Sequence, residues 1–205
     1  MCGRYYLDAT TETEPFIQQM MKSPLVRKWS DTCGVKSFGE IRPTDVVPVI
    51  APDKSGKQAV YPMKWGYQGQ KNLLINARVE TAAEKLTFRD DWKSHRCIVP
   101  ALYYYEWEHL TLNNGNTKTG DKYAIQPKDS NITWLCGLYH IENSLPMFVI
   151  LTRAAEENIR FIHDRMPLIM PKDLIETWIK PDSDPDMLVE KALTQMVAER
   201  TQKGE

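Results

Sequence analysis

The 205-residue sequence lacks the features that mark membrane, secreted or disulfide-stabilised proteins. No apolar run reaches the roughly 18 residues that a membrane-spanning helix needs. The N-terminus lacks the basic and apolar pattern of a signal peptide. The four cysteines lie far apart and form no CxxC pair, so we expect reduced thiols rather than a zinc site or a disulfide framework. We therefore expect a cytoplasmic protein that needs no metal and no other cofactor.

The sequence also lacks a strong excess of charge of either sign. It has 26 Lys and Arg against 27 Asp and Glu, which gives a formal net charge of −1. This balance excludes a uniformly basic surface for coating nucleic acid, although basic residues can still gather in one groove. The length suits one domain, and the 42% of hydrophobic residues can form a sizeable core.

Turn residues divide the chain into short segments, with strand patterns in the middle and helical patterns toward the ends. Helices are expected over residues 14–22, 154–162, 171–179 and 185–200. Strands are expected over residues 46–50, 58–65, 73–78, 96–107, 122–126, 133–141 and 147–152, with a polar turn at 111–120. The pattern predicts an α+β fold, a single domain with a curved, barrel-like antiparallel β-sheet flanked by helices. We expect a domain over residues 1–180 and a helical extension, packed on it or peripheral to it, over 181–205.

The first four residues, Met1-Cys2-Gly3-Arg4, contain the most reactive group that the sequence offers. A small residue after the initiator Met normally permits its removal, so we expect the mature chain to begin at Cys2. An N-terminal cysteine carries an α-amine and a thiol whose ordinary pKa values are about 8 and 8.5. This pair can close onto an aldehyde as a thiazolidine, or the amine can act as the base for its own thiol. Cys2 can equally be an accident of the second codon.

A polar row interrupts the apolar pattern between residues 74 and 81. Asn76, Arg78 and Glu80 alternate with apolar residues, so on a strand they would share one face. The row could serve a function, but an ordinary solvated face with an Arg78–Glu80 ion pair explains it more simply.

Two other segments place ionisable side chains in unusual surroundings. Glu106 stands within the aromatic run 103–107, where burial would suit a carboxyl group to acid–base work. Alternatively, Glu106 points outward between rings that point inward. The His-Asp-Arg sequence at residues 163–165 follows a predicted helix, and it could equally be an arrangement that caps that helix.

Five motifs occur in order along the chain. They are Met-Cys-Gly-Arg at the start, Trp65-Gly-Tyr67, Asn76-Ala-Arg-Val-Glu-Thr81, Arg96-Cys-Ile-Val-Pro100 with Tyr105-Glu-Trp107, and Ile162-His-Asp-Arg-Met-Pro167. Together they resemble the SRAP family, the SOS-response-associated peptidases that process abasic sites. The resemblance extends from Cys2 to about Ile179. It implies covalent capture of abasic sites in single-stranded DNA, as a thiazolidine formed by the N-terminal cysteine.

The resemblance also implies a role for each matching residue. The catalytic set is Cys2 as nucleophile, Asn76 as sensor of the abasic site, Glu106 as catalytic carboxylate and His163 as the group that stabilises the lesion. The enzyme would have crosslinking, lyase-type activity with autoproteolytic removal of Met1. It would act as a monomer and would associate with the nucleoid when bound to damaged DNA.

Further residues are expected to contact the DNA on either side of the lesion. The resemblance assigns phosphate contacts to Arg4, Arg78 and Arg165. Arg42 could also follow the backbone, while Trp65 or Trp107 could stack on a flanking base. The chain departs from the family pattern at residues 40–43, where Glu-Ile-Arg-Pro replaces the frequent Asn-x-Ala-Pro, and in the short loop before Asn76.

Two other classes of function remain open at this point. Glutamine amidotransferases of the N-terminal-nucleophile type also begin Met-Cys-Gly, and Asn114-Gly115 could supply an oxyanion contact. The 205 residues offer no synthase domain to use the ammonia, and that class does not explain segments 76–81 and 162–167. A non-catalytic module that binds single-stranded DNA fits the basic and aromatic residues but leaves Cys2 without a role.

Overall fold

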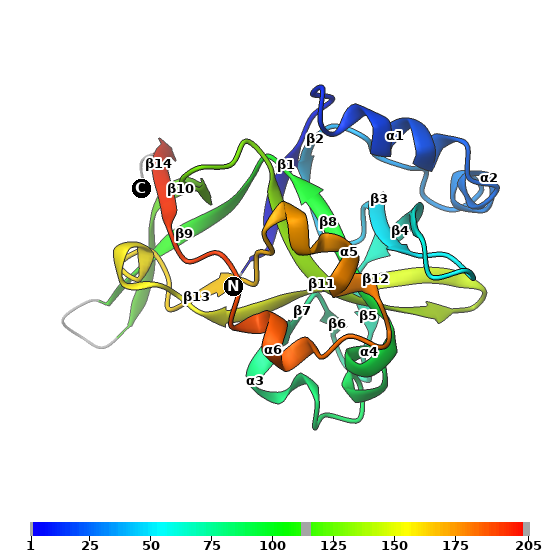
Figure 1. Ribbon diagram of the computed structural model, residues 1–205. Coiled ribbons are helices and arrows are strands. Elements are labelled where there is room, and N and C mark those ends of the chain that lie inside the picture. The colour runs from blue at the N-terminus through cyan, green and yellow to red at the C-terminus, as the bar shows by residue number, and fades with distance from the viewer. Residues whose placement is uncertain (1, 112–115, 203–205) are drawn as a thin grey trace.

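The computed structural model describes residues 2–111 and 116–202, and strands predominate in it (Figure 1). The strands are β1 (Arg4–Leu7), β2 (Gly39–Ile41), β3 (Val46–Pro52), β4 (Gln58–Trp65), β5 (Tyr67–Gln68), β6 (Leu73–Leu74), β7 (Asn76–Arg78), β8 (Arg96–Ala101), β9 (Tyr103–Thr111), β10 (Thr117–Pro127), β11 (Thr133–Glu142), β12 (Leu145–Ala154), β13 (Arg165–Pro167) and β14 (Met196–Gln202). The helices are α1 (Glu14–Met21), α2 (Leu25–Ser30), α3 (Val79–Ala82), α4 (Arg89–Ser94), α5 (Ile175–Ile179) and α6 (Pro185–Val189), with 3₁₀ turns at Glu157–Ile159 and Lys172–Leu174. In the described part of the chain, no helix is long and apolar enough to cross a membrane.

Five strands close into a ring in the order β11-β8-β3-β4-β12, because β12 also pairs with β11. The neighbours are antiparallel, except that β12 and β4 run parallel at their contact. Strands β13 and β7 extend the ring from β12. The α+β fold with a barrel-like sheet that the sequence predicts is therefore confirmed.

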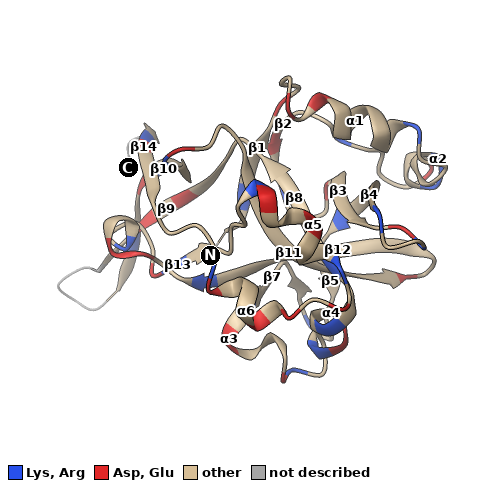
Figure 2. Ribbon diagram, in the orientation of Figure 1, with Lys and Arg blue, Asp and Glu red and all other residues tan. Residues whose placement is uncertain are grey.

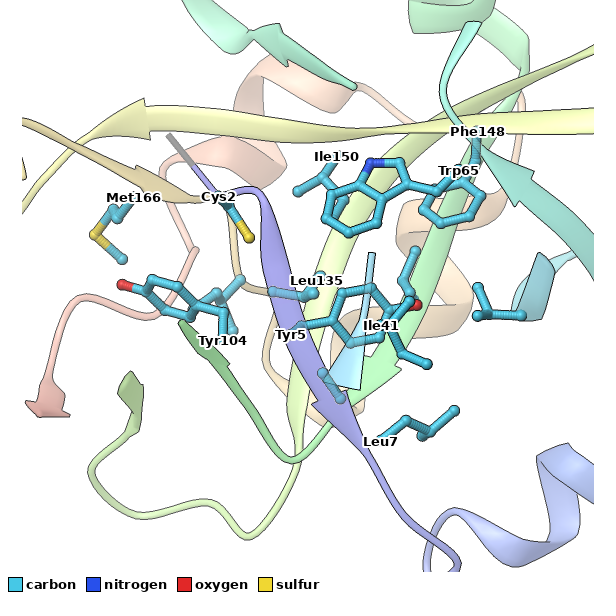
Figure 3. Packing of buried hydrophobic residues seen from close by; sticks show 14 of the residues in the cluster. Cys2, Tyr5, Leu7, Ile41, Trp65, Tyr104, Leu135, Phe148, Ile150 and Met166 are labelled. Carbon is cyan, nitrogen blue, oxygen red and sulfur yellow. The ribbon is translucent and has the colours of Figure 1, made fainter. Parts of the chain in front are cut away.

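A second, antiparallel sheet in the order β14-β10-β9-β1-β2 packs against the ring. The two sheets share one apolar core, to which the second sheet contributes Tyr5 and Tyr104 and the ring contributes Leu135 and Ile150 (Figure 3). Alternate residues of the ring strands face a second core under the short helices, where Trp134 packs with residues of α4 and α5. Cys2 packs in the core between the two sheets.

The prediction of a helix over residues 185–200 is wrong. Helix α6 ends at Val189, and residues 196–202 form β14, which pairs with β10 at the edge of the second sheet. Leu188, Ala192 and Met196 are all buried, and their spacing of four residues imitates a helical period. The region expected to be a helical extension therefore contains one short helix and an edge strand.

Two further segments differ from the expected pattern. Residues 154–162 contain a single 3₁₀ turn rather than a helix, because β12 continues to Ala154. Within the expected turn at 111–120, Thr111 belongs to β9 and residues 117–120 belong to β10, with Thr117 paired opposite Thr111. The turn itself, at 112–115, lies outside the described residues, as do Met1 and residues 203–205.

Candidate functional site

Cys2 lies two residues before the start of β1, and its side chain is completely buried. Its sulfur points into the core between the two sheets (Figure 3). Burial raises the pKa of this thiol well above its ordinary value, and the negative charge of Glu106 raises it further. Apolar surroundings therefore disfavour the thiolate of Cys2 in the folded chain. A base must remove the thiol proton when Cys2 reacts.

Glu106 is buried on the inward face of β9, together with Tyr104. Its Oε1 accepts a 3.3 Å hydrogen bond from the backbone N–H of Trp107. The charge of Glu106 raises the pKa of both the Cys2 thiol and the His163 imidazole, so the carboxylate acts on both groups. The alternative in which Glu106 points outward is excluded, since Tyr104 and Glu106 are buried whereas Trp107 is partly exposed.

His163 lies between the 3₁₀ turn that ends at Ile159 and strand β13, so it does not cap a long helix. Its Nδ1 accepts a 2.9 Å hydrogen bond from the backbone N–H of Arg165. The Asp164 carboxylate also lies 2.7 Å from Nδ1, but its side chain is 81% exposed and that contact needs a protonated ring. Burial lowers the pKa of His163, so we assign the neutral ring with its proton on Nε2.

Asn76 begins β7 and lies opposite Ile150, which packs in the same core as Cys2. Its amide nitrogen donates a long, 3.4 Å hydrogen bond to the carbonyl of Ile150. Its amide oxygen is buried and has no hydrogen-bond partner within the described residues. A buried acceptor without a partner is costly, so this oxygen is available to a donor on a ligand.

The polar row at residues 76–80 does not lie on one strand, because β7 ends at Arg78 and Glu80 belongs to α3. Glu80 pairs with Arg165, at 2.6 and 2.8 Å, and this pairing lowers the pKa of Glu80. The Arg78–Glu80 ion pair expected from the sequence is therefore wrong. Arg78 is exposed at the start of α3, where it can meet a solvent-borne anion.

The remaining predicted DNA contacts divide into accessible and inaccessible residues. Trp65 is fully buried and donates a hydrogen bond from its ring nitrogen to the carbonyl of Ile75, at 2.9 Å. A ring with no exposed face cannot stack on a base, so the expected role of Trp65 is not supported. Arg4, Arg42 and Trp107 retain accessible surface on the outer side of the second sheet.

Sequence reasoning missed Glu40 as the point at which several basic side chains meet. Arg4 lies 3.3 Å from Glu40, Arg42 lies 3.1 Å away, and Lys122 lies 3.0 Å away. In the whole molecule, charges of both signs are interspersed rather than separated (Figure 2). The sequence carries no local signal for this, because the position of Glu40 opposite Tyr6 depends on the pairing of β1 with β2.

A second polar cluster lies away from Cys2, around the buried Asp91. Its carboxylate contacts His95 at 2.9 Å, His140 at 3.1 Å and the hydroxyl of Tyr67 at 3.0 Å. Over residues 2–111 and 116–202, no group of three or more His, Cys, Asp or Glu side chains is placed to hold a metal ion. Asn114 and Gly115, the oxyanion candidates of the amidotransferase alternative, lie outside the described residues.

Comparison with protein families matches residues 1–203 to the model of the SOS response associated peptidase (SRAP) family. Abasic site processing protein YobE of Bacillus subtilis is 40% identical over 121 residues, which cover 56% of this chain and 53% of that protein. Abasic site processing protein YedK of Escherichia coli is 30% identical over 131 residues, covering 59% and 55%. The chain thus spans about half the length of the curated relatives it matches.

Solved structures show a similar fold at low sequence identity. A phage-related protein from Bordetella bronchiseptica matches with a TM-score of 0.72 and 19% identity over 100% of both chains. A protein from Bacteroides thetaiotaomicron matches with a TM-score of 0.71 and 21% identity over 98% of this chain and 92% of that one. At these identities the comparison concerns the fold alone.

Proposed function

The chain belongs to the SOS response associated peptidase (SRAP) family, and we propose that it captures abasic sites in single-stranded DNA as a covalent crosslink to Cys2. Removal of Met1, which we propose is autoproteolytic, gives Cys2 an α-amine beside its thiol. One observation carries the proposal: Cys2, Glu106 and His163 are all buried, with Glu106 near enough to the other two for its charge to raise their pKa values. The names of the relatives, abasic site processing proteins, support the same substrate.

The first step is opening of the abasic sugar, because only its open form presents an aldehyde. The anomeric hydroxyl loses its proton as the aldehyde forms, and the ring oxygen gains a proton to become a hydroxyl. With its proton on Nε2, His163 can donate that hydrogen to the ring oxygen, and Glu106 can accept the proton from the anomeric hydroxyl.

The second step joins Cys2 to the aldehyde carbon. The α-amine adds to the carbonyl, and loss of one water leaves an imine. The thiol then adds across the carbon–nitrogen double bond, with sulfur bonding to carbon and the thiol proton passing through Glu106 to nitrogen. Burial raises the pKa of the thiol, which favours capture by the amine before addition of sulfur.

Two further side chains position the reactants. The Asn76 amide oxygen has no partner among the described residues and can accept a hydrogen bond from the Cys2 amine or the sugar. Arg165 is held by Glu80 and also donates to the Thr152 carbonyl, at 2.7 Å, so its orientation is fixed before DNA binds. An amine and an aldehyde held in register react as if they were one molecule, which raises the rate strongly.

The proposal is tested by incubating the purified protein with an abasic single strand and separating the products under denaturing conditions. We expect a heat-stable adduct with the abasic strand and none with the undamaged strand. Cys2→Ala should form no stable adduct, and a normal yield from this variant would contradict the proposed nucleophile. Release of glutamate from glutamine by the wild-type protein would favour the amidotransferase alternative instead.

A matched pair of variants separates the two proton-transfer roles. His163→Ala should crosslink slowly with the natural abasic site but recover substantially with an analogue that cannot cyclise, because its aldehyde is already exposed. Glu106→Gln should recover less, since imine formation and thiol addition still require a proton acceptor. Equal recovery of both variants in single-turnover rates would contradict this division of roles.

A further inference from the structure

The side chain of His109, near the end of β9, lies against His163. The centres of the two rings are 4.3 Å apart, and 57° separates their planes. The backbone N–H of His109 also donates a 3.2 Å hydrogen bond to the carbonyl of Ile162, the residue before His163. Strand β9 is thus joined to the segment that carries His163 through the backbone and through the two side chains.

The two rings differ in their exposure to solvent. His163 is 9% exposed, whereas His109 is exposed, so His109 covers the buried ring on the side where they touch. The Nδ1 atom of His163 is held by the backbone N–H of Arg165, at 2.9 Å. One hydrogen bond fixes one atom of a ring but leaves its tilt about that bond less restricted. Packing against His109 supplies the second restraint.

Charged groups from several segments act on His163. Burial lowers the pKa of His163, while the charges of Glu106 and Asp164 raise it. The charges of the terminal amine and of His109 lower it further. The Glu108 carboxylate, next to His109 in the chain, instead accepts hydrogen bonds from two residues of β10, at 3.1 and 3.2 Å. Two protonated imidazoles in contact repel each other, so a proton on His109 disfavours one on His163.

We propose that His109 is a positioning residue that acts through His163. The proposal rests on the proposed function and adds one residue to its first step, the opening of the abasic sugar. The His109 ring holds the His163 imidazole in the orientation from which its Nε2 meets the ring oxygen of the sugar. The charge of a protonated His109 keeps the His163 ring neutral, which is the form assigned to that step.

The contact between the rings favours this role over direct binding of a DNA phosphate by His109. An imidazolium that only bound a phosphate would gain nothing from a second titratable ring beside it. A residue that acts through His163 should lose its effect when His163 is absent, whereas a phosphate contact should keep it.

The first test compares single-turnover crosslinking by His109→Ala, His163→Ala and the double variant, with the natural abasic strand. His109→Ala should crosslink up to about 10²-fold more slowly, because a small misplacement of a reacting group lowers the rate strongly. In the double variant, loss of His109 should cause no further slowing. Leu110→Ala, which removes the next, exposed side chain of β9, should crosslink normally. A normal rate for His109→Ala, or a further loss in the double variant, would overturn the proposal.

The second test uses His109→Phe, which keeps a ring against His163 but cannot carry a charge. Because the repelling charge is lost, His163 should protonate at higher pH, and the acidic limb of the crosslinking rate should move to higher pH. Titration of the His163 ring protons by NMR, without DNA, should show the same direction of change. An unmoved titration in a variant with a normal melting curve would overturn the proposal. If the wild type forms no adduct but the titration still moves, the proposed chemistry fails and the control of His163 by His109 stands.

Discussion

Arg96 and Arg165 both belong to motifs that the sequence shares with its family, yet their surroundings differ. Arg96 is fully buried, and all three of its guanidinium nitrogens donate to oxygen atoms of the chain, among them the carbonyls of Trp92, at 2.7 Å, and Trp178, at 2.9 Å. Arg165 reaches Glu80 with its two terminal nitrogens, but its buried Nε has no partner within the described residues.

The same contrast holds for the neighbours of these arginines. Around Arg96, oxygens from α4, α5 and the turn at 180–183 converge on one cation, so the fold itself uses every donor. Near Cys2, the amide oxygen of Asn76 and the hydroxyl of Tyr104 are buried and have no hydrogen-bond partner in the part of the chain that the structure describes. Natural cores seldom leave such atoms unpaired. The difference indicates that Arg96 holds the fold together, while the region around Cys2 keeps polar groups for a ligand.

The largest effect should come from a substitution in the region around Cys2. Glu106→Gln keeps the shape of the side chain but removes its ability to accept protons. We expect single-turnover crosslinking to slow by about 10²- to 10⁴-fold. The thermal unfolding midpoint should change little. A rate within a few-fold of wild type would show that Glu106 does not carry the proton transfers.

A substitution at Arg96 should instead lower stability and leave the crosslinking activity of the folded protein unchanged. Arg96→Met leaves several buried carbonyls without a donor, and each unpaired group costs about 1–3 kcal/mol. We expect a loss of at least about 3 kcal/mol in the free energy of unfolding, measured by urea denaturation. Crosslinking per folded molecule should be close to normal. Normal stability would contradict the role assigned to Arg96.

A smaller effect on DNA binding is expected at Arg78, which is exposed, whereas Arg165 is held in place by Glu80. If Arg78 binds a phosphate, Arg78→Ala should make the log–log salt dependence of single-strand binding shallower by about 0.7. Lys85→Ala removes an exposed cation from the region after α3 and serves as the control. An unchanged slope for Arg78→Ala would show that Arg78 remains solvated in the complex.

The smallest effect concerns the Asp91 cluster. As around Arg96, its charged groups contact other groups of the same chain. Burial lowers the pKa of His140, but Asp91 and Glu142 outweigh it, and the net shift is above the ordinary value of 6.5. The stabilisation of the folded state by protonated His140 should be present below pH 6.5 and be lost as the pH rises through the raised pKa of His140. His140→Gln should flatten this part of the curve of unfolding free energy against pH. An identical slope in both proteins would exclude this linkage.

Asp91 sets the acidic side of the same curve. Burial raises the pKa of Asp91, but hydrogen bonds from His140 and His95 outweigh it, so the net shift is below the ordinary value of 3.8. The stabilisation of the folded state by ionised Asp91 should be present above pH 3.8 and be lost as the pH falls through the lowered pKa of Asp91.

The sequence predicts those features that depend on local pattern. Short strand patterns separated by turn residues were sufficient to expect a barrel-like sheet, whereas the aromatic run around Glu106 left open whether its carboxylate is buried. The strand at 196–202 was missed because Leu188, Ala192 and Met196 have helical spacing, while their burial depends on a distant strand. Local pattern cannot reveal such pairing.

Contacts between distant segments account for the other differences. The partner of Glu80 is Arg165, 85 residues away, and the burial of Trp65 depends on packing against Tyr5 and Phe148. The raised pKa of the Cys2 thiol also arises only when the two sheets enclose it. These properties follow from tertiary structure, so residue type and spacing do not contain them.

The most direct test of the account is the intact mass of the adduct before and after borohydride treatment. A thiazolidine at Cys2 predicts the mass of the chain without Met1, plus the abasic strand, minus one water. Borohydride should leave this mass unchanged, because no imine remains. An adduct that gains two hydrogens, or one that retains Met1, would contradict covalent capture by the amine and thiol of Cys2.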